Sequence, residues 1–184
     1  MKIWTSCIVV MLIIALGCES CGYDEYVSDE ITAMQIEGFD NSGKIPKPIE
    51  SGLCSGQAYM LWVSFQISDY GDVAELANPM VALRFITLTD FDEAHRAGSD
   101  VTEMFDMHPI RPEISGSDYD TYIYEPVRFA MPSRQSPLAV VYKEGAYFML
   151  MESPKDKREC RFAAEVEFSD GKILSAQCEA VTLY

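Results

Sequence analysis

The sequence predicts an all-β domain, a β-sandwich of about seven strands with one short helical segment near 99–106. Three observations support this fold class. Apolar residues alternate with polar ones over short stretches, clusters of Gly, Pro, Asn and Asp separate those stretches, and only one segment carries a helix start signal. An immunoglobulin-like form is one version of this sandwich. A small β-barrel is the alternative.

The N-terminal part of the domain contains the clearest strand signal. Residues 31–38 form a plausible first strand, and Asn41-Ser42-Gly43 with two prolines marks the loop after it. Residues 57–68 alternate throughout, so we expect their odd positions to face the core: Tyr59, Leu61, Val63, Phe65 and Ile67. On the other face, Trp62 covers an edge or a second layer.

The next strands are separated by a connection. We expect residues 69–78 to form that connection, with a short helical turn, and 81–89 to form a strand. Residues 121–129 are a further strand, which Pro126 confines to an edge or a bulge.

Residues 90–112 break the β rhythm. Asp100 and Glu103 suit the start of one helical turn. Its apolar side chains, Val101, Met104 and Phe105, would pack the turn onto a sheet.

Two hairpins are predicted at the C-terminal end. The first joins 138–142 to 146–151 through a loop with Gly145 left-handed. This loop pairs Tyr142 with Ala146, Val140 with Phe148 and Leu138 with Leu150.

The second hairpin joins 160–168 to 172–183 around Ser169-Asp170-Gly171. A two-residue turn would set apolar residues against polar ones. A three-residue loop with Gly171 left-handed keeps one face apolar, so we favour it. It pairs Val166 with Leu174, Ala164 with Ala176 and Phe162 with Cys178, and it sets Cys160 opposite Ala180.

The N-terminus has the pattern of an export signal. A single cation, Lys2, precedes an apolar run that ends in a small residue before Cys18. The run is shorter than the roughly 20 residues that cross a bilayer. We therefore expect residues 1–17 to be a signal peptide, 18–30 an acidic tether, and 31–184 a single β domain.

Residues 15–18, Ala-Leu-Gly-Cys, resemble a bacterial lipobox, with its first two residues in swapped order. The resemblance implies that Cys18 carries a lipid. An ordinary signal peptidase would cut the same bond, because Ala15 and Gly17 are small.

Cysteine parity favours the lipidated form. Of six cysteines, Cys7 leaves with the signal, and lipidation of Cys18 leaves an even number: Cys21, Cys54, Cys160 and Cys178. In the register above, Cys160 and Cys178 are diagonal neighbours on the buried face. We therefore predict Cys160–Cys178 with Cys21–Cys54 as the first of three possible disulfide connectivities. Buried free thiols are the alternative.

The chain is strongly acidic, with a formal net charge of −15. Loss of residues 1–17, which contain one base and no acid, leaves 13 bases against 29 acids, a net of −16. A nucleic-acid partner is excluded because phosphate contacts need a basic surface. Attachment to an anionic membrane surface would have to come from acyl chains.

No motif assigns a catalytic residue, a cofactor or a metal. The sequence has no nucleophile elbow, phosphate loop, dinucleotide fingerprint or His-Glu-x-x-His. One acidic cluster could offer oxygens to calcium: Asp90, Asp92, Glu93, His95, Asp100, Glu103, Asp106 and His108. No calcium-loop motif is present, so we interpret it as a solvated acidic loop.

Aromatic residues are the remaining candidates for ligand binding. Tyr122 and Tyr124 share one strand face near Tyr119, and sugars stack on exposed rings. With Trp62 they form a candidate carbohydrate site, although strand tyrosines usually serve packing.

The acidic tether, Ala97-Gly98-Ser99-Asp100 before a short helix, and the C-terminal Phe-Ser-Asp-Gly-Lys-Ile-Leu hairpin complete a resemblance. With the lipobox-like residues, the chain resembles small Bacteroidetes lipoproteins of unknown function. This resemblance implies a lipid-anchored outer-membrane protein on the periplasmic or surface face. We expect a non-enzymatic role that binds a partner or supports the envelope. A glycan-binding accessory lipoprotein is the alternative, and a hydrolase the second alternative.

Overall fold

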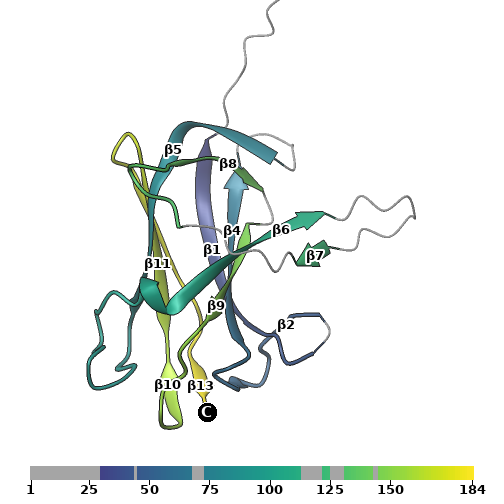
Figure 1. The fold of residues 1–184 in the computed structure, drawn as a ribbon, viewed down its shortest axis with the longest axis vertical. Helices are drawn as coiled ribbons and strands as arrows, with labels where there is room; N and C mark the ends of the chain where they lie inside the picture. The colour runs from purple at the N-terminus through teal and green to yellow at the C-terminus, as the bar shows by residue number, and fades with distance from the viewer. Residues whose placement is uncertain (1–29, 44, 68–72, 113–121, 125–130, 143–144) are drawn as a thin grey trace, which may run out of the picture.

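The computed structural model describes residues 30–43, 45–67, 73–112, 122–124, 131–142 and 145–184. For 73, 74, 108–112, 122–124 and 142 it describes the backbone only. The described segments form strands and one 3₁₀ turn, η1 (Thr102–Met104). Two open sheets face each other as a sandwich, and neither closes into a barrel, which confirms the predicted fold class (Figure 1).

The larger sheet has six strands in the order β2-β1-β4-β9-β6-β7 and forms the right-hand side of Figure 1. All its pairings are antiparallel. The strand bounds are β1 (Ile31–Asp40), β2 (Lys47–Pro48), β4 (Tyr59–Ile67), β6 (Phe105–Pro112), β7 (Tyr122–Tyr124) and β9 (Ala146–Leu150).

The opposite sheet has four strands in the order β12-β11-β5-β8. Its strands are β5 (Val73–Thr87), β8 (Leu138–Tyr142), β11 (Phe162–Phe168) and β12 (Ile173–Gln177). A small third sheet lies at the end of the molecule that holds the C-terminus (Figure 1). It contains β10 (Arg158–Cys160), β13 (Val181–Leu183) and β3 (Leu53–Cys54), and β3 runs parallel to β13.

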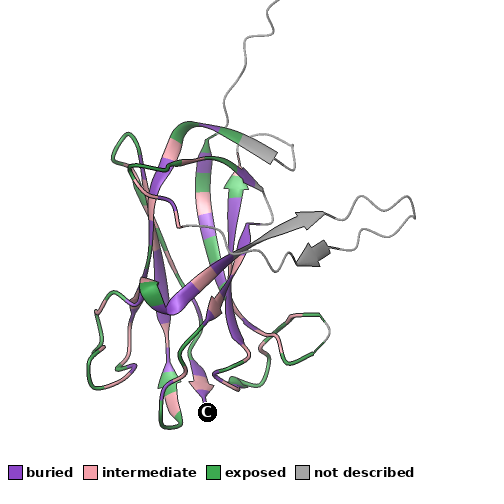
Figure 2. Ribbon diagram, viewed as in Figure 1, coloured by how far each residue is buried: buried purple, intermediate pink, exposed green. Residues whose placement is uncertain are grey.

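One aromatic cluster fills the space between the two large sheets. Phe85 of β5 packs against Phe105 of β6 and Phe148 of β9, with ring centroids 4.7 and 4.9 Å apart. Phe162 of β11 continues the cluster to Phe105 and Tyr59, at 5.4 and 5.8 Å. Figure 2 shows buried residues (purple) along the strands of both sheets. These rings hold one sheet against the other by removing apolar surface from water.

The strand predicted over 57–68 is β4, and four of its five predicted core positions are buried: Tyr59, Leu61, Val63 and Phe65. Ile67 is half-buried. Burial does not alternate along the strand, because Met60 and Ser64 on the other face are buried too, and Trp62 there is half-buried.

The predicted helical segment is a single 3₁₀ turn, Thr102–Met104. Val101, Met104 and Phe105, at and beside this turn, pack into the core as expected.

The second hairpin has the predicted register. β11 and β12 pair Val166 with Leu174 and Ala164 with Ala176, and Gly171 has a φ of 86°. The register then shifts by one residue in the third sheet. Cys160 therefore lies opposite Val181 rather than the predicted Ala180.

The prediction of a first hairpin, joining 138–142 to 146–151, was wrong. β8 pairs with β5 in the four-stranded sheet, whereas β9 pairs with β4 and β6 in the six-stranded sheet. The chain therefore crosses between sheets near Gly145, which has a φ of 75°. A Cβ on Gly145 would lie 1.7 Å from the Val63 carbonyl oxygen, so the crossing needs glycine for space as well as conformation.

Two segments expected to be irregular are strands. Residues 73–78 belong to β5, where a register shift between Glu75 and Met80 accommodates the bend. Residues 105–112 form β6, although Pro109 and Pro112 interrupt their pattern. With the short pairings of β2, β3 and β10, the described residues contain thirteen strands rather than about seven.

Candidate functional site

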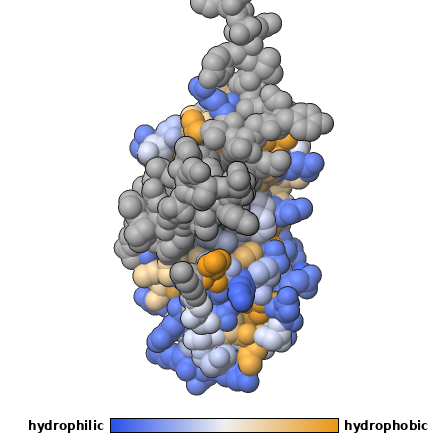
Figure 3. Space-filling model, turned by 90° about the vertical axis from the view of Figure 1, so that its right-hand side faces the viewer, coloured by the Kyte–Doolittle hydropathy of each residue, from blue (hydrophilic) through white to orange (hydrophobic). Residues whose placement is uncertain are grey.

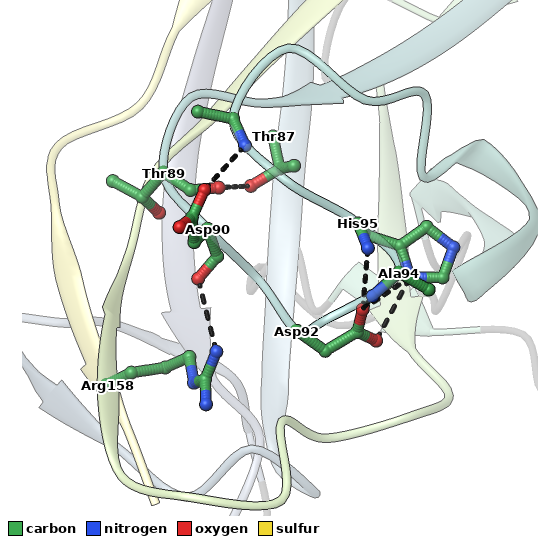
Figure 4. Close-up of polar contacts among 8 residues, drawn as sticks. Thr87, Thr89, Asp90, Asp92, Ala94, His95 and Arg158 are labelled. Carbon is green, nitrogen blue, oxygen red and sulfur yellow. Dashed lines mark hydrogen bonds and ion pairs between the residues drawn. The ribbon is translucent and has the colours of Figure 1, made fainter.

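The acidic loop between β5 and η1 is organised by Asp92. Its carboxylate accepts hydrogen bonds from the backbone N–H groups of Ala94 and His95, at 2.8 and 2.6 Å. The His95 ring Nδ1 lies 2.9 Å from the same oxygen (Figure 4). The hydrogen bond with the His95 ring, and then those from the backbone, lower the pKa of Asp92. Asp92 thus fixes a tight turn of the loop.

Asp90 holds the two ends of the same loop. Its carboxylate accepts hydrogen bonds from the Ala97 backbone N–H and from Arg96, both at 3.0 Å, and these bonds lower its pKa. Arg158 of β10 donates to the Asp90 carbonyl oxygen at 3.5 Å (Figure 4). Between the two aspartates, Phe91 is buried at 1% exposure and packs against Phe162.

The predicted acidic cluster is dispersed in space. Asp100 accepts hydrogen bonds from the N–H and hydroxyl of Thr102, and Asp106 lies on β6. Glu93 and Glu103 are exposed, and the His108 side chain lies outside the described part. Among the residues that the structure describes, no three His, Cys, Asp or Glu side chains converge on a possible metal position. The carboxylates of Asp90, Asp92 and Asp100 accept hydrogen bonds from the backbone of the same loop, and so stabilise its conformation.

A small hollow lies where β1 begins. Glu30, Leu76, Asn78, Phe168 and Lys172 are among the residues that line its roughly 20 Å³. This volume accommodates about one water molecule. Lys172 Nζ donates to the Glu30 carboxylate at 2.6 Å and to the Ile31 carbonyl at 3.0 Å across the hollow's rim. The contact joins the β11–β12 turn to the start of β1.

The outer face of the six-stranded sheet presents ordered rows of side chains. Directly opposed residues share a face, so the register places Glu37, Trp62 and Tyr147 in one row. The next row contains Phe39, Met60, Met149 and Asp106. Figure 3 looks onto this side of the molecule, where apolar residues (orange) lie among hydrophilic ones (blue).

Three aromatic rings form the centre of this face. Phe39 makes edge contacts with Trp62 and with Tyr147, at centroid distances of 5.7 and 5.4 Å. Phe39 is only 8% exposed, so it supports the two half-buried rings above it. Burial raises the pKa of Tyr147, and the Glu37 carboxylate raises it further. We call Glu37, Phe39, Trp62 and Tyr147 the aromatic patch.

The predicted carbohydrate site is tested only in part. Trp62 does lie on an outer sheet face, whereas Tyr119 falls outside the described residues. Tyr122 and Tyr124 belong to β7, of which only the backbone is described. β7 is three strands from β4, or about 14 Å at the usual strand spacing. The partners of Trp62 in the patch, Phe39 and Tyr147, were missed. They lie on strands other than β4, so only the register brings them beside it.

The three described cysteines are free, buried thiols. The predicted Cys160–Cys178 disulfide is therefore not formed in this structure. The one-residue register shift between β11–β12 and β10–β13 removes the diagonal arrangement on which that prediction relied. Burial raises the pKa of Cys160 to about 11 and raises that of Cys178 as well.

The predicted Cys21–Cys54 pair has no support in the structure. Cys21 lies outside the described residues, and Cys54 is a free thiol with 1% exposure. Burial and nearby Asp40 raise the pKa of Cys54 to about 11. Asp40 ends β1, so Cys54 lies near the end of this ten-residue strand that is opposite Ile31. Ten strand residues span about 33 Å.

The three thiols surround one buried phenol. Tyr59 is 1% exposed, and its hydroxyl lies 3.9 Å from the sulfur of Cys178. Burial, with contributions from Cys178, Cys160 and Cys54, raises the pKa of Tyr59 well above its ordinary value. The backbone N–H of Phe162 also donates to the Cys178 sulfur, at 3.3 Å. These contacts describe a neutral, densely packed cluster.

The predicted signal peptide and Cys18 lie outside the described residues. Within the described part, no helix is long and apolar enough to cross a membrane. Comparison with protein-family models, with curated proteins and with solved structures found no match for this chain.

Proposed function

We propose that the chain is a non-enzymatic lipoprotein of the cell envelope. We propose further that it binds its partners through the outer face of the six-stranded sheet. The observation that carries the binding role is the aromatic patch. Two half-buried rings lie beside an exposed carboxylate on a sheet face rather than within the core. Aromatic side chains at a surface offer large apolar area at a small cost in conformational entropy.

The sequence supports a lipid anchor. The lipobox-like residues before Cys18 would place a diacylglyceryl group at the start of the mature chain. β1 begins at one end of the molecule, and Tyr184 lies at the other (Figure 1). An anchor attached before β1 would therefore join the domain at the end opposite Tyr184.

The hydrolase alternative gains nothing from the described residues. The hollow beside Lys172 holds about one water molecule, and Asp90 and Asp92 have lowered pKa values because they serve as acceptors in a loop. A general acid needs the opposite shift.

The anchor is tested by intact mass spectrometry of the chain purified from its native membrane. We expect a chain that begins at Cys18 and carries added diacylglyceryl mass. The Cys18→Ser variant should lose that mass and leave the membrane fraction, whereas Cys21→Ser, a matched cysteine three residues away, should behave as wild type. An unmodified, water-soluble chain with Cys18 intact would refute the anchor.

A further inference from the structure

We propose that Lys172 is a clasp that holds the start of β1 against the turn between β11 and β12, and that this end of β1 opens first when the clasp is lost. The Lys172 Nζ donates to the Glu30 carboxylate at 2.6 Å and to the Ile31 carbonyl oxygen at 3.0 Å. One ammonium group thus bonds two consecutive residues where β1 begins. The inference does not depend on the binding role of the aromatic patch.

The clasp bridges two strands of different sheets. β1 lies in the six-stranded sheet and β12 at the edge of the four-stranded one, and the topology of the described residues has no ladder between them. Cα atoms of the two strands nevertheless come within 8 Å of each other. The Lys172 side chain, at the start of β12, therefore joins neighbouring strands that no ladder of hydrogen bonds connects.

The ladder between β1 and β4 is irregular at this end. Ile31 lies opposite Ile67, and the register shifts before Ala33 pairs with Gln66. Such an irregularity disrupts the ladder locally, and strand ends are where local opening costs the least free energy. Ile31 is nevertheless only 2% exposed and belongs to the core. A core side chain is thus buried at a strand end that its own sheet holds incompletely.

The turn that carries Lys172 is itself held in place. The Lys172 backbone N–H donates to the Asp170 carboxylate, and its carbonyl oxygen accepts from the Phe168 N–H, both at 2.9 Å. The Ser169 N–H donates to the carbonyl oxygen of Pro79 in β5, also at 2.9 Å. Because the backbone is already fixed to the four-stranded sheet, only the side chain of Lys172 loses conformational freedom when the clasp forms.

The clasp also borders the small hollow at this end of the sandwich. The hollow is lined by the three clasp residues, Glu30, Ile31 and Lys172, and by Leu76 and Phe168, which are 6% and 4% exposed. Opening the start of β1 would bring water to these apolar side chains. The clasp and the burial of apolar surface therefore stabilise the same closed arrangement.

The clasp lies where the predicted tether enters the domain. Glu30 is the last residue of that tether, so a pull on a lipid anchor would reach β1 through the clasped residues. Lys172 would pass part of this load to the four-stranded sheet. This consequence rests on the proposed anchor, whereas the clasp itself does not.

Hydrogen–deuterium exchange of the full chain measures the opening of β1. The amides of residues 31–34 report the clasp, and those of residues 163–166 in β11 serve as the internal reference. Lys172→Met keeps a side chain of similar length without a donor. It should accelerate exchange in 31–34 by about five- to tenfold, as loss of partly exposed charged hydrogen bonds does, and leave 163–166 unchanged. Glu30→Gln, which keeps an acceptor oxygen but loses the charge, should accelerate exchange in 31–34 by about two- to threefold.

Lys155→Met is the matched control, because Lys155 is exposed in the loop between β9 and β10 and its loss changes the net charge equally. It should exchange as wild type. Exchange in 31–34 that stays within about twofold of wild type in Lys172→Met overturns the clasp. An equal acceleration in 163–166 also overturns it, because the whole domain would then open rather than the start of β1.

A second variant decides if circular dichroism shows that Lys172→Met is unfolded. Acceleration confined to 31–34 in Glu30→Gln then supports the clasp, and unchanged or uniformly faster exchange overturns it. Every one of these results leaves the lipid anchor standing, because mass spectrometry tests the anchor separately. An unlipidated chain whose Lys172→Met variant exchanges faster in 31–34 would refute the anchor alone.

Discussion

At the scale of single residues, burial decides the chemistry of the cysteines. Cys54, Cys160 and Cys178 are at most 1% exposed and lie near the equally buried Tyr59. A thiolate is the reactive form of cysteine, and burial in apolar surroundings disfavours it. The raised pKa values, about 11 for Cys54 and Cys160, therefore describe thiols that are protected chemically as well as sterically.

We predict that these three thiols do not react in the native protein. Iodoacetamide labelling near neutral pH, followed by peptide mass spectrometry, should leave Cys54, Cys160 and Cys178 unlabelled until denaturant is added. All three should then label, because unfolding exposes them and restores their ordinary pKa. Detection of any one of them in a disulfide-linked peptide from the native, unreduced protein would contradict the prediction.

At the scale of elements, the loop between β5 and η1 depends on side-chain acceptors. Asp90 and Asp92 accept the backbone N–H groups of Ala97, Ala94 and His95, which no strand partner satisfies. Each carboxylate must be ionised to accept these bonds at full strength. The loop in turn keeps Phe91 packed in the core.

We predict that Asp92→Asn destabilises the protein more near about pH 5.5 than near about pH 2.5, on either side of the ordinary carboxyl pKa. The folded-state pKa of Asp92 is lowered, so its contribution is present above the unfolded pKa and disappears as the pH falls through the folded value. Urea unfolding of both proteins at the two pH values measures this difference. Glu93→Gln, at an exposed neighbouring position, should match wild type at both. An equal effect of Asp92→Asn at both pH values would contradict a role for its charge.

Strands and their pairing were predictable where one face of the strand is buried and the paired strands are joined by a short turn. The buried odd positions of β4 and the register of β11 with β12 follow from residues close in sequence, such as Val166 and Leu174. The partner of β8 was not predictable in this way. A left-handed glycine at position 145 is compatible with a hairpin loop and with a crossing between sheets. The close approach of Gly145 to the Val63 carbonyl, which shows that the chain crosses here, is a contact between residues far apart in sequence.

The same limit applies to the candidate site. Trp62 was identifiable because it interrupts the polar positions of an alternating strand. Its neighbours Phe39 and Tyr147 lie on β1 and β9, whose register against β4 is a tertiary property. The predicted Cys160–Cys178 disulfide was wrong for a related reason. An even number of cysteines does not say which of them lie close together, and a one-residue register shift decides whether two of them can form a bond.

At the scale of the whole molecule, a single core joins the sheets. The buried cluster contains residues of both large sheets and of the small third sheet. Phe85 is at its centre, with 0% exposure and contacts to rings on β6 and β9. Since each sheet buries its inner face only against the other, neither can persist alone, and we expect one cooperative unfolding transition.

We predict that Phe85→Ala lowers the free energy of unfolding by about 3–5 kcal/mol, the usual cost of removing a buried phenylalanine ring. That is a large part of the roughly 5–15 kcal/mol that stabilises a typical domain. Far-UV circular dichroism and Trp62 fluorescence should report the same shifted midpoint, although Trp62 lies on the far side of β4 from Phe85. Ile173→Ala, exposed on the same sheet as Phe85, should stay within about 0.5 kcal/mol of wild type. Two separate transitions in the two signals would mean that the sheets unfold independently, and the aromatic cluster would then not be the contact that unites them.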